Sequence, residues 1–185
     1  MGAWLQSCLV QIYCADMTDL TVWGILLTIL FLTVYRRYQH NMWWKVTLGT
    51  ILIFCTVVVI YATVGNRGGG HEVRLNLIPF HSYRAVQAGA TPELYRSNFM
   101  NVALFYPVGL LATVLLPEKW QGWCKIVLVT LLLLVISAGV EYAQYYYALG
   151  DCEIDDVIHN TAGALTGSLA VVLFPMLEAF ARKHF

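Results

Sequence analysis

Charged residues are scarce in this sequence. Only 12% of its 185 residues are Asp, Glu, Lys or Arg, whereas 59% are hydrophobic. A soluble domain of this size needs more polar residues to cover a single buried core, so the composition excludes that class. Apolar stretches long enough to cross a bilayer follow one another along the chain. We therefore expect an all-α fold, a polytopic bundle of about five transmembrane helices.

An excess of basic residues is missing as well. The 11 Lys and Arg are balanced by 11 Asp and Glu, so no nucleic-acid partner is expected. Residues 1–19 contain no Lys or Arg, and no small-residue cleavage site accompanies the first apolar stretch. A signal peptide has a basic N-terminal region and a small-residue cleavage site, so we expect the first span to remain in the mature protein.

The expected spans are joined by short turns, except for one long hydrophilic loop. They run from about Leu20 to Tyr35, Val46 to Val64, Asn98 to Leu116, Ile126 to Leu149 and Val157 to Ala181. Residues 1–19 are expected to form an interfacial tail, Thr91 and Pro92 to begin the third helix, and Pro107 to kink it. The chain thus divides into residues 1–64, residues 65–181 and a tail at 182–185.

The basic residues predict the orientation of the bundle. One end carries Arg36, Arg37, Lys45, Lys119, Lys125, Arg182 and Lys183. Positive charge favours the cytoplasmic side, so we expect the N-terminus outside, the C-terminus in the cytoplasm and the loop from residue 65 to 98 outside. This loop contains Arg67, Arg74, Arg84 and Arg96. Because these four run against the usual bias, we expect them to serve the structure or a ligand.

Polar side chains interrupt the last three spans. A carboxylate within a span costs about 2.5–3.5 kcal/mol, so Glu141 requires a partner, a water-filled cavity or a function. The helical rise places it about 22 Å above the cytoplasmic end of its span, in the outer third of the membrane. Gln144 follows one turn later on the same face, and Asn101 and Asn160 reach a similar depth. We therefore expect three helices to direct polar groups to one outer level.

Each of these residues also has a structural interpretation. Asn and Gln within spans often only join helices, by hydrogen bonds worth about 0.6–2 kcal/mol. Glu141 has the alternative of pairing with an outer arginine, and Asp155 with Asp156 that of capping the fifth helix. Asp156 shares a helical stripe with Asn160 and two glycines, Gly163 and Gly167, which let a neighbouring backbone approach closely. We expect this stripe to face the bundle.

Four motifs occur in order between residues 75 and 167. They comprise Asn76 to Phe80; Asn101, Phe105, Pro107 and Gly109; Ser137, Glu141 and Gln144; and Asp155, Asp156, Asn160, Thr161, Gly163 and Gly167. Together they resemble the VanZ-like family of membrane proteins. The family often has a basic residue in the turn before the acidic pair, where this sequence has Asp151.

The resemblance implies a multi-pass protein of the bacterial cell membrane, related to an accessory determinant of teicoplanin and lipoglycopeptide resistance. The expected partners are membrane lipids and either a lipid-linked peptidoglycan precursor or a lipoglycopeptide. The candidate ligand-binding residues are Glu141, Gln144, Asp155, Asp156, Asn160, Asn101, Arg84, Arg74 and Arg96. Arginine suits anionic headgroups, and the amides and carboxylates offer further hydrogen bonds.

Three functions are compatible with this pattern. The first is a module that binds or shields an amphiphilic envelope component at the outer leaflet. The second is a membrane-embedded enzyme acting on a lipid-linked substrate, with Glu141 or Asp155 as general base. The third is a proton-coupled carrier, against which the lack of an evident inverted repeat counts. Whether the chain is an enzyme stays open.

Signals for other chemistry are weak. His71, His81 and His159 have no established metal-ligand spacing, so neither a metal nor a cofactor is expected. The glycines at residues 68–70 are expected to form a linker, and the serines lack a nucleophile and base arrangement. A bridge between Cys14 and Cys152 on the outer side is one alternative, but unpaired apolar cysteines are favoured.

Overall fold

A computed structural model describes residues 3–65, 74–91 and 93–184, with side chains from residue 17 onward apart from Gly65. In chain order, the elements are α1 (Ala3–Tyr38), α2 (Met42–Ile60), the π-helical turn η1 (Tyr61–Gly65), β1 (Leu75–Asn76), α3 (His81–Gln87), α4 (Glu93–Leu115), α5 (Gly122–Tyr146), β2 (Cys152–Glu153) and α6 (Ile154–His184). Five of these helices are long and apolar enough to cross a membrane, which confirms the predicted all-α membrane bundle.

The helix boundaries differ from the expected spans mainly at the N-terminus. The residues of the expected interfacial tail are part of α1, which continues without a break over its 36 residues, and their interfacial position stays a prediction. No proline interrupts this stretch, so the helix has no reason to end before the span begins. At the third span, α4 begins at Glu93 and continues through Pro107. The predicted role of Pro92 lies outside the described residues.

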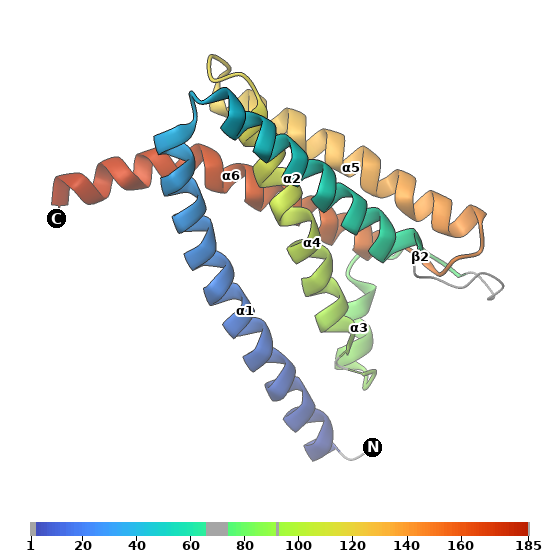
Figure 1. Cartoon of the computed structure of the whole chain (residues 1–185). Coiled ribbons are helices and arrows are strands. Elements are labelled where there is room, and N and C mark those ends of the chain that lie inside the picture. Colours follow the sequence, from blue (N-terminus) through green and yellow to red (C-terminus); the bar gives the residue numbers. More distant parts are fainter. Residues whose placement is uncertain (1–2, 66–73, 92, 185) are drawn as a thin grey trace.

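The centre of the bundle is the contact between α4 and α6, with α2 and α5 beside it (Figure 1). Glycines make this contact close. A Cβ atom on Gly163 would overlap the carbonyl oxygen of Val102, and one on Gly167 would overlap that of Tyr106. The predicted stripe of small residues therefore faces the bundle, and it lets α4 and α6 meet backbone to backbone.

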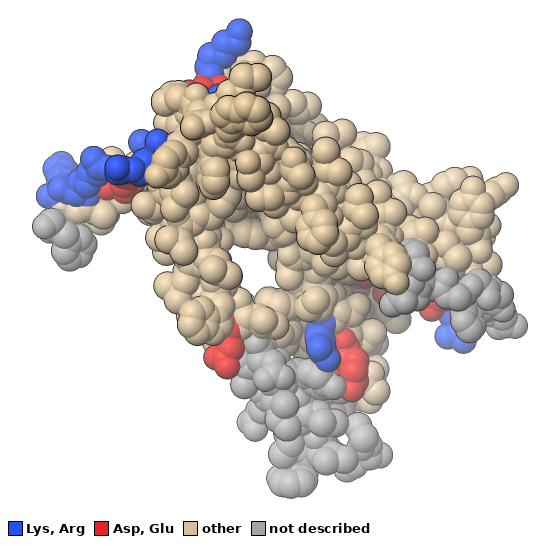
Figure 2. All heavy atoms as spheres, in the orientation of Figure 1, with Lys and Arg blue, Asp and Glu red and all other residues tan. Residues whose placement is uncertain are grey.

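Helix α1 diverges from the other helices (Figure 1). It contributes Leu32 and Tyr35 to an apolar cluster with α2 and α4, close to its C-terminal end. Further toward the N-terminus its apolar side chains are exposed, with Trp23 at 65% and Leu27 at 61%. Figure 2 shows an opening through the molecule beside this helix. In a membrane, lipid chains contact these residues, since exposed apolar side chains match the hydrocarbon.

The two ends of the bundle differ in charge. We call one the basic end: it comprises the α1–α2 turn (residues 39–41), the α4–α5 turn (residues 116–121) and the C-terminal part of α6. The opposite, acidic end comprises α3, β1, β2 and the turn between α5 and α6 (residues 147–153). Figure 2 shows groups of Lys and Arg side chains around the basic end.

Two short strands hold the acidic end together. β1 pairs in parallel with β2, with Leu75 opposite Cys152. The Cys152 amide donates to the carbonyl of Arg74 at 2.9 Å, and the Arg74 amide donates to the Asp151 carboxylate at 3.0 Å. The long loop is thus fastened to the acidic turn. The glycines at residues 68–70 and His71 lie outside the described residues, as do the side chains of Cys8 and Cys14.

Candidate functional site

The first two turns of α6 carry four buried or half-buried polar side chains. They are Asp155, Asp156, His159 and Asn160. Because residues four apart in a helix lie one above the other, they form two rows, one of Asp155 with His159 and one of Asp156 with Asn160. Each row faces different segments of the protein.

Asp155 fastens the outer loop to α6. Its carboxylate is 1% exposed and accepts hydrogen bonds from the Phe80 amide at 2.5 Å, the Ser82 amide at 2.9 Å and the Ser82 hydroxyl at 2.6 Å. The Asn98 side chain in turn donates to the Ser82 hydroxyl at 2.8 Å. These bonds compensate the cost of burying a carboxylate. We call this arrangement the Asp155 clasp.

The Asp155 clasp accounts for the backbone conformation at the end of the Asn-Leu-Ile-Pro-Phe motif. Phe80 has a φ of 58°, in the left-handed region that aromatic residues rarely adopt. This conformation comes immediately before α3 and coincides with the hydrogen bond from the Phe80 amide to Asp155. Earlier in the motif, the Asn76 side chain accepts the Ile78 amide at 3.3 Å, forming a local turn. The motif thus shapes the loop that Asp155 holds.

His159 continues the same row and contacts α3. One ring nitrogen lies 2.8 Å from the Tyr83 hydroxyl, and the other lies 2.5 Å from the Asp155 carbonyl oxygen. The pair borders a cavity of about 470 Å³ lined by Met17, Tyr83, Tyr95, Asn98, Phe99, Val102 and His159. Within the described part of the chain, no group of three His, Cys, Asp or Glu side chains could hold a metal ion.

The second row joins α6 to its neighbouring helices. The Asn101 side chain donates to the Asp156 carboxylate at 2.7 Å, which links α4 to α6. The Asn160 side chain donates to the Ser137 hydroxyl at 2.9 Å, which links α5 to α6. Both bonds fit the structural interpretation of intramembrane asparagines.

Glu141 and Gln144 lie on one face of α5, as the sequence predicted. Glu141 is 3% exposed, and its carboxylate accepts the Glu153 amide at 3.0 Å. Gln144 is fully buried and donates to the Thr63 carbonyl in η1 at 2.7 Å. Because η1 directly follows α2, this hydrogen bond joins the end of α2 to α5. Gln144 thus joins two helices, while Glu141 meets the acidic turn.

Glu141 also borders a cavity at the acidic end, which we call the Glu141 cavity. Its volume is about 350 Å³, and it is lined by Leu75, Leu77, Ala138, Glu141, Tyr142, Tyr145, Cys152, Glu153, Ile154 and Val157. Apart from Glu141, Cys152, Glu153 and the tyrosine hydroxyls, the lining side chains are apolar. A buried carboxylate against an apolar cavity is the arrangement expected for recognition of an amphiphilic molecule.

The three described outer arginines are exposed: Arg74 precedes β1, Arg84 lies in α3 and Arg96 lies in α4. Among the described residues, no ion pair joins Arg74, Arg84 or Arg96 to Glu141. Arg67 lies outside the described residues, so pairing of Glu141 with an outer arginine stays a prediction. Arg84 donates to the carbonyl oxygens of Pro79 and Phe80 and so stabilises its own loop. Arg74 precedes Leu75, a residue that lines the Glu141 cavity.

Sequence comparisons confirm the family resemblance. The sequence profile of the VanZ/LLP1 family matches residues 22–175. This chain belongs to the VanZ/LLP1 family. Protein VanZ from Enterococcus faecium is 33% identical over 101 residues, which cover 52% of this chain and 59% of that relative. The chain therefore aligns with less than two thirds of the relative. No solved structure matches the chain.

In this VanZ/LLP1 protein, three motif residues of α6 join it to other segments: Asp155 holds the loop before α3, Asp156 bonds Asn101 of α4, and Asn160 bonds Ser137 of α5. Family membership and the five apolar helices make it a multi-pass membrane protein of bacteria. Of the predicted ligand-binding residues, Asp155, Asp156, Asn101, Asn160 and Gln144 all have protein partners. Their binding of a ligand stays a prediction. Sequence reasoning missed Ser82 as the partner of Asp155 and Asn98 as the partner of Ser82, and no periodicity pointed to them.

Electrostatics at the acidic turn of the VanZ/LLP1 chain favour protonated side chains. Burial, followed by the negative charge of Asp156 and two further aspartates, raises the pKa of Glu153 above its ordinary value. Burial, followed by the charge of Glu141, likewise raises the pKa of the Cys152 thiol. The cysteine is therefore a poor nucleophile, because the thiolate is its reactive form. Cys152 forms no disulfide with the other cysteines whose side chains are described.

Proposed function

We propose that this chain binds or shields an amphiphilic molecule at its acidic end, which the charge pattern predicts to face outward. The ligand is a lipid-linked component of the cell envelope or an amphiphilic glycopeptide, with a role in teicoplanin or lipoglycopeptide resistance. Membership of the VanZ/LLP1 family and the relation to Protein VanZ support the envelope context. The observation that carries the proposal is the Glu141 carboxylate on an apolar cavity.

The cavity offers complementary chemistry to each part of such a ligand. Leu77, Tyr145 and Val157 provide an apolar wall for an acyl chain. The Glu141 carboxylate accepts hydrogen bonds from hydroxyl or ammonium groups. Arg74, next to the wall residue Leu75, supplies a guanidinium for a phosphate. An amphiphile can therefore place its chain along α5 and its polar part at the strand pair.

The surrounding hydrogen bonds hold this site in shape before a ligand arrives. Glu153 contributes both to the cavity wall and, through its amide, to the position of Glu141. The strand pair and the Asp155 clasp fix the two ends of the loop that carries Leu75 and Leu77. Preorganisation of this kind lowers the entropic cost of binding.

Binding by the purified full chain in lipid nanodiscs tests the proposal. The probes are teicoplanin and a lipid-linked peptidoglycan precursor, compared for the parent protein and Glu141→Gln. We expect the variant to bind at least one probe about tenfold more weakly, since a hydrogen bond to a charged group contributes about 1.5–3 kcal/mol. Asp151→Asn is the matched control, because that carboxylate is exposed and does not line the cavity.

Unchanged binding of both probes by Glu141→Gln, together with unchanged drug susceptibility of cells producing it, would show the proposal to be wrong. The enzymatic alternative predicts a different result. Incubation of the protein with lipid extract would then yield a new product, and Glu141→Gln would abolish its formation while binding persisted.

A further inference from the structure

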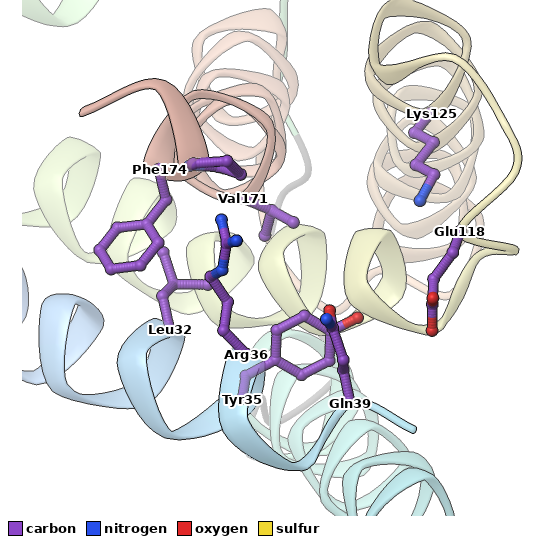
Figure 3. Close-up of a pocket in the computed structure, with 9 residues that line it drawn as sticks. Leu32, Tyr35, Arg36, Gln39, Glu118, Lys125, Val171 and Phe174 are labelled. Atoms are coloured by element: carbon purple, nitrogen blue, oxygen red, sulfur yellow. The ribbon is translucent and has the colours of Figure 1, made fainter. Parts of the chain in front are cut away.

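Another cavity lies at the basic end of the bundle, opposite the end that holds the Glu141 cavity. Its volume is about 320 Å³, and it is lined by Leu32, Tyr35, Arg36, Gln39, Glu118, Lys125, Val171, Phe174 and Pro175. These residues come from α1, the α1–α2 turn, the α4–α5 turn, α5 and α6 (Figure 3). We call it the basic-end cavity.

The lining of this cavity is amphipathic. Leu32, Val171 and Phe174 form an apolar wall, while Arg36 and Lys125 extend toward the same space from different helices (Figure 3). The two cations approach from α1 and α5, two segments far apart in the sequence. A group bound between them would therefore contact positive charge and hydrocarbon together.

Positive charge around the cavity exceeds negative charge. The Glu118 carboxylate lies 3.2 Å from the Lys45 ammonium and 3.6 Å from a ring nitrogen of His40. The Glu178 carboxylate lies 3.3 Å from the Arg36 guanidinium and also pairs with that of Arg182. Both carboxylates thus already have cationic or imidazole partners.

Lys125 is the second cation that lines the basic-end cavity. Among the described residues, no carboxylate lies within 4.0 Å of its ammonium group. The ammonium group donates a hydrogen bond to the Leu116 carbonyl oxygen at 3.5 Å, and this neutral acceptor does not neutralise its charge. The side chain is half-buried, so water screens this charge less than it would on an open surface. The lining of the cavity thus includes the Arg36 guanidinium and a Lys125 ammonium with no carboxylate at ion-pair distance among the described residues.

We propose that the basic-end cavity binds the phosphate headgroup of an anionic membrane lipid, in the leaflet at the basic end. Basic cavities between transmembrane helices near the membrane surface have the charge and shape that anionic lipid headgroups require. The apolar wall favours a lipid over free phosphate, because only a lipid brings a chain to cover the half-buried Val171 and Phe174. A lipid here would join α1 to α5 and α6. This inference is independent of the function proposed for the acidic end.

Native mass spectrometry of the full chain in detergent, titrated with phosphatidylglycerol or phosphatidylcholine, tests the inference. We expect phosphatidylglycerol to bind more tightly. Lys125→Gln should weaken its binding about fivefold, the usual effect of one cation near an anionic lipid. Lys119→Gln is the matched control, since this lysine lies in the adjoining α4–α5 turn but does not line the cavity, and it should leave binding unchanged.

A second variant separates binding from folding. Glu118→Gln removes the one carboxylate that lines the cavity and should tighten phosphatidylglycerol binding, a change that a folding defect cannot produce. Equal weakening by Lys119→Gln and Lys125→Gln would overturn the inference in favour of diffuse surface charge. Equal affinity for the two lipids would overturn it too. Displacement of the lipid by equimolar inorganic phosphate would identify free phosphate as the ligand instead.

Discussion

Replacing Asp155 by Asn keeps the size of the side chain but disrupts the Asp155 clasp. The carboxylate accepts three hydrogen bonds, two from backbone amides and one from the Ser82 hydroxyl. An asparagine presents one oxygen and one NH₂ group, so at least one backbone N–H must face another donor. Hydrogen bonds to charged groups contribute about 1.5–3 kcal/mol each, and an unpaired buried donor costs a similar amount. We expect Asp155→Asn to lower the free energy of unfolding by about 2–4 kcal/mol.

Unfolding in mixed micelles with increasing SDS measures this loss, and hydrogen exchange locates it. The amides of Phe80 and Ser82 should exchange faster in the variant, because they lose their acceptor. Asp151→Asn is the matched control. Its carboxylate is exposed and accepts one amide hydrogen bond, from Arg74, so we expect a loss of no more than about 1 kcal/mol.

Two results would refute this reasoning. One is an equal loss of stability in Asp155→Asn and Asp151→Asn. The other is unchanged exchange of the Phe80 and Ser82 amides, which would mean that the carboxylate does not hold the loop. Ser82→Ala provides an intermediate step, because it removes the hydroxyl but keeps the amide bond, and we expect it to cost about 1 kcal/mol.

Three further predictions concern helix packing, pH and surface charge. Gly163→Ala should destabilise the bundle by about 1–3 kcal/mol in SDS unfolding, because its Cβ would overlap α4, whereas Gly139→Ala, with open space, should be neutral or stabilising. The pKa of Glu153 is raised above its ordinary value of 4.5, so ionisation of this carboxyl opposes folding. The parent protein should therefore lose stability as the pH rises from 4.5 through the raised pKa. Glu153→Gln should remove this loss, and melting at a series of pH values checks it. Arg36→Gln breaks a partly exposed ion pair and should change stability by no more than about 1 kcal/mol, which melting at low and high salt measures.

The sequence predicted the features of this fold that depend on periodicity. Apolar stretches indicated the five long helices, and the spacing of Gly163 and Gly167 indicated the side of α6 that faces the bundle. Helical geometry likewise placed Glu141 and Gln144 on one buried face. Each of these inferences requires only the neighbours along one helix, which the sequence provides directly.

The partners of these residues could not be predicted in the same way. Glu141 meets a backbone amide in β2, and Gln144 meets a backbone carbonyl in η1. Every residue carries such backbone groups, so residue identity cannot single out the one that is used. The contact of Asp155 with the loop depends on the left-handed conformation of Phe80, which its residue type does not favour. Tertiary packing determines these contacts.

The convergence of hydrogen bonds on the start of α6 also constrains how the protein is made. Helices α4 and α5 precede α6 in the chain, so they leave the ribosome and enter the membrane first. Until α6 arrives, Asn101 and Ser137 lack the partners that they have in the finished bundle. The contacts of α4 and α5 with α6 therefore form only after Asp156 and Asn160 reach the bilayer, whereas α1, α2 and α4 can pack together earlier. A truncation before α6 would leave the inserted helices without the contact at the centre of the bundle.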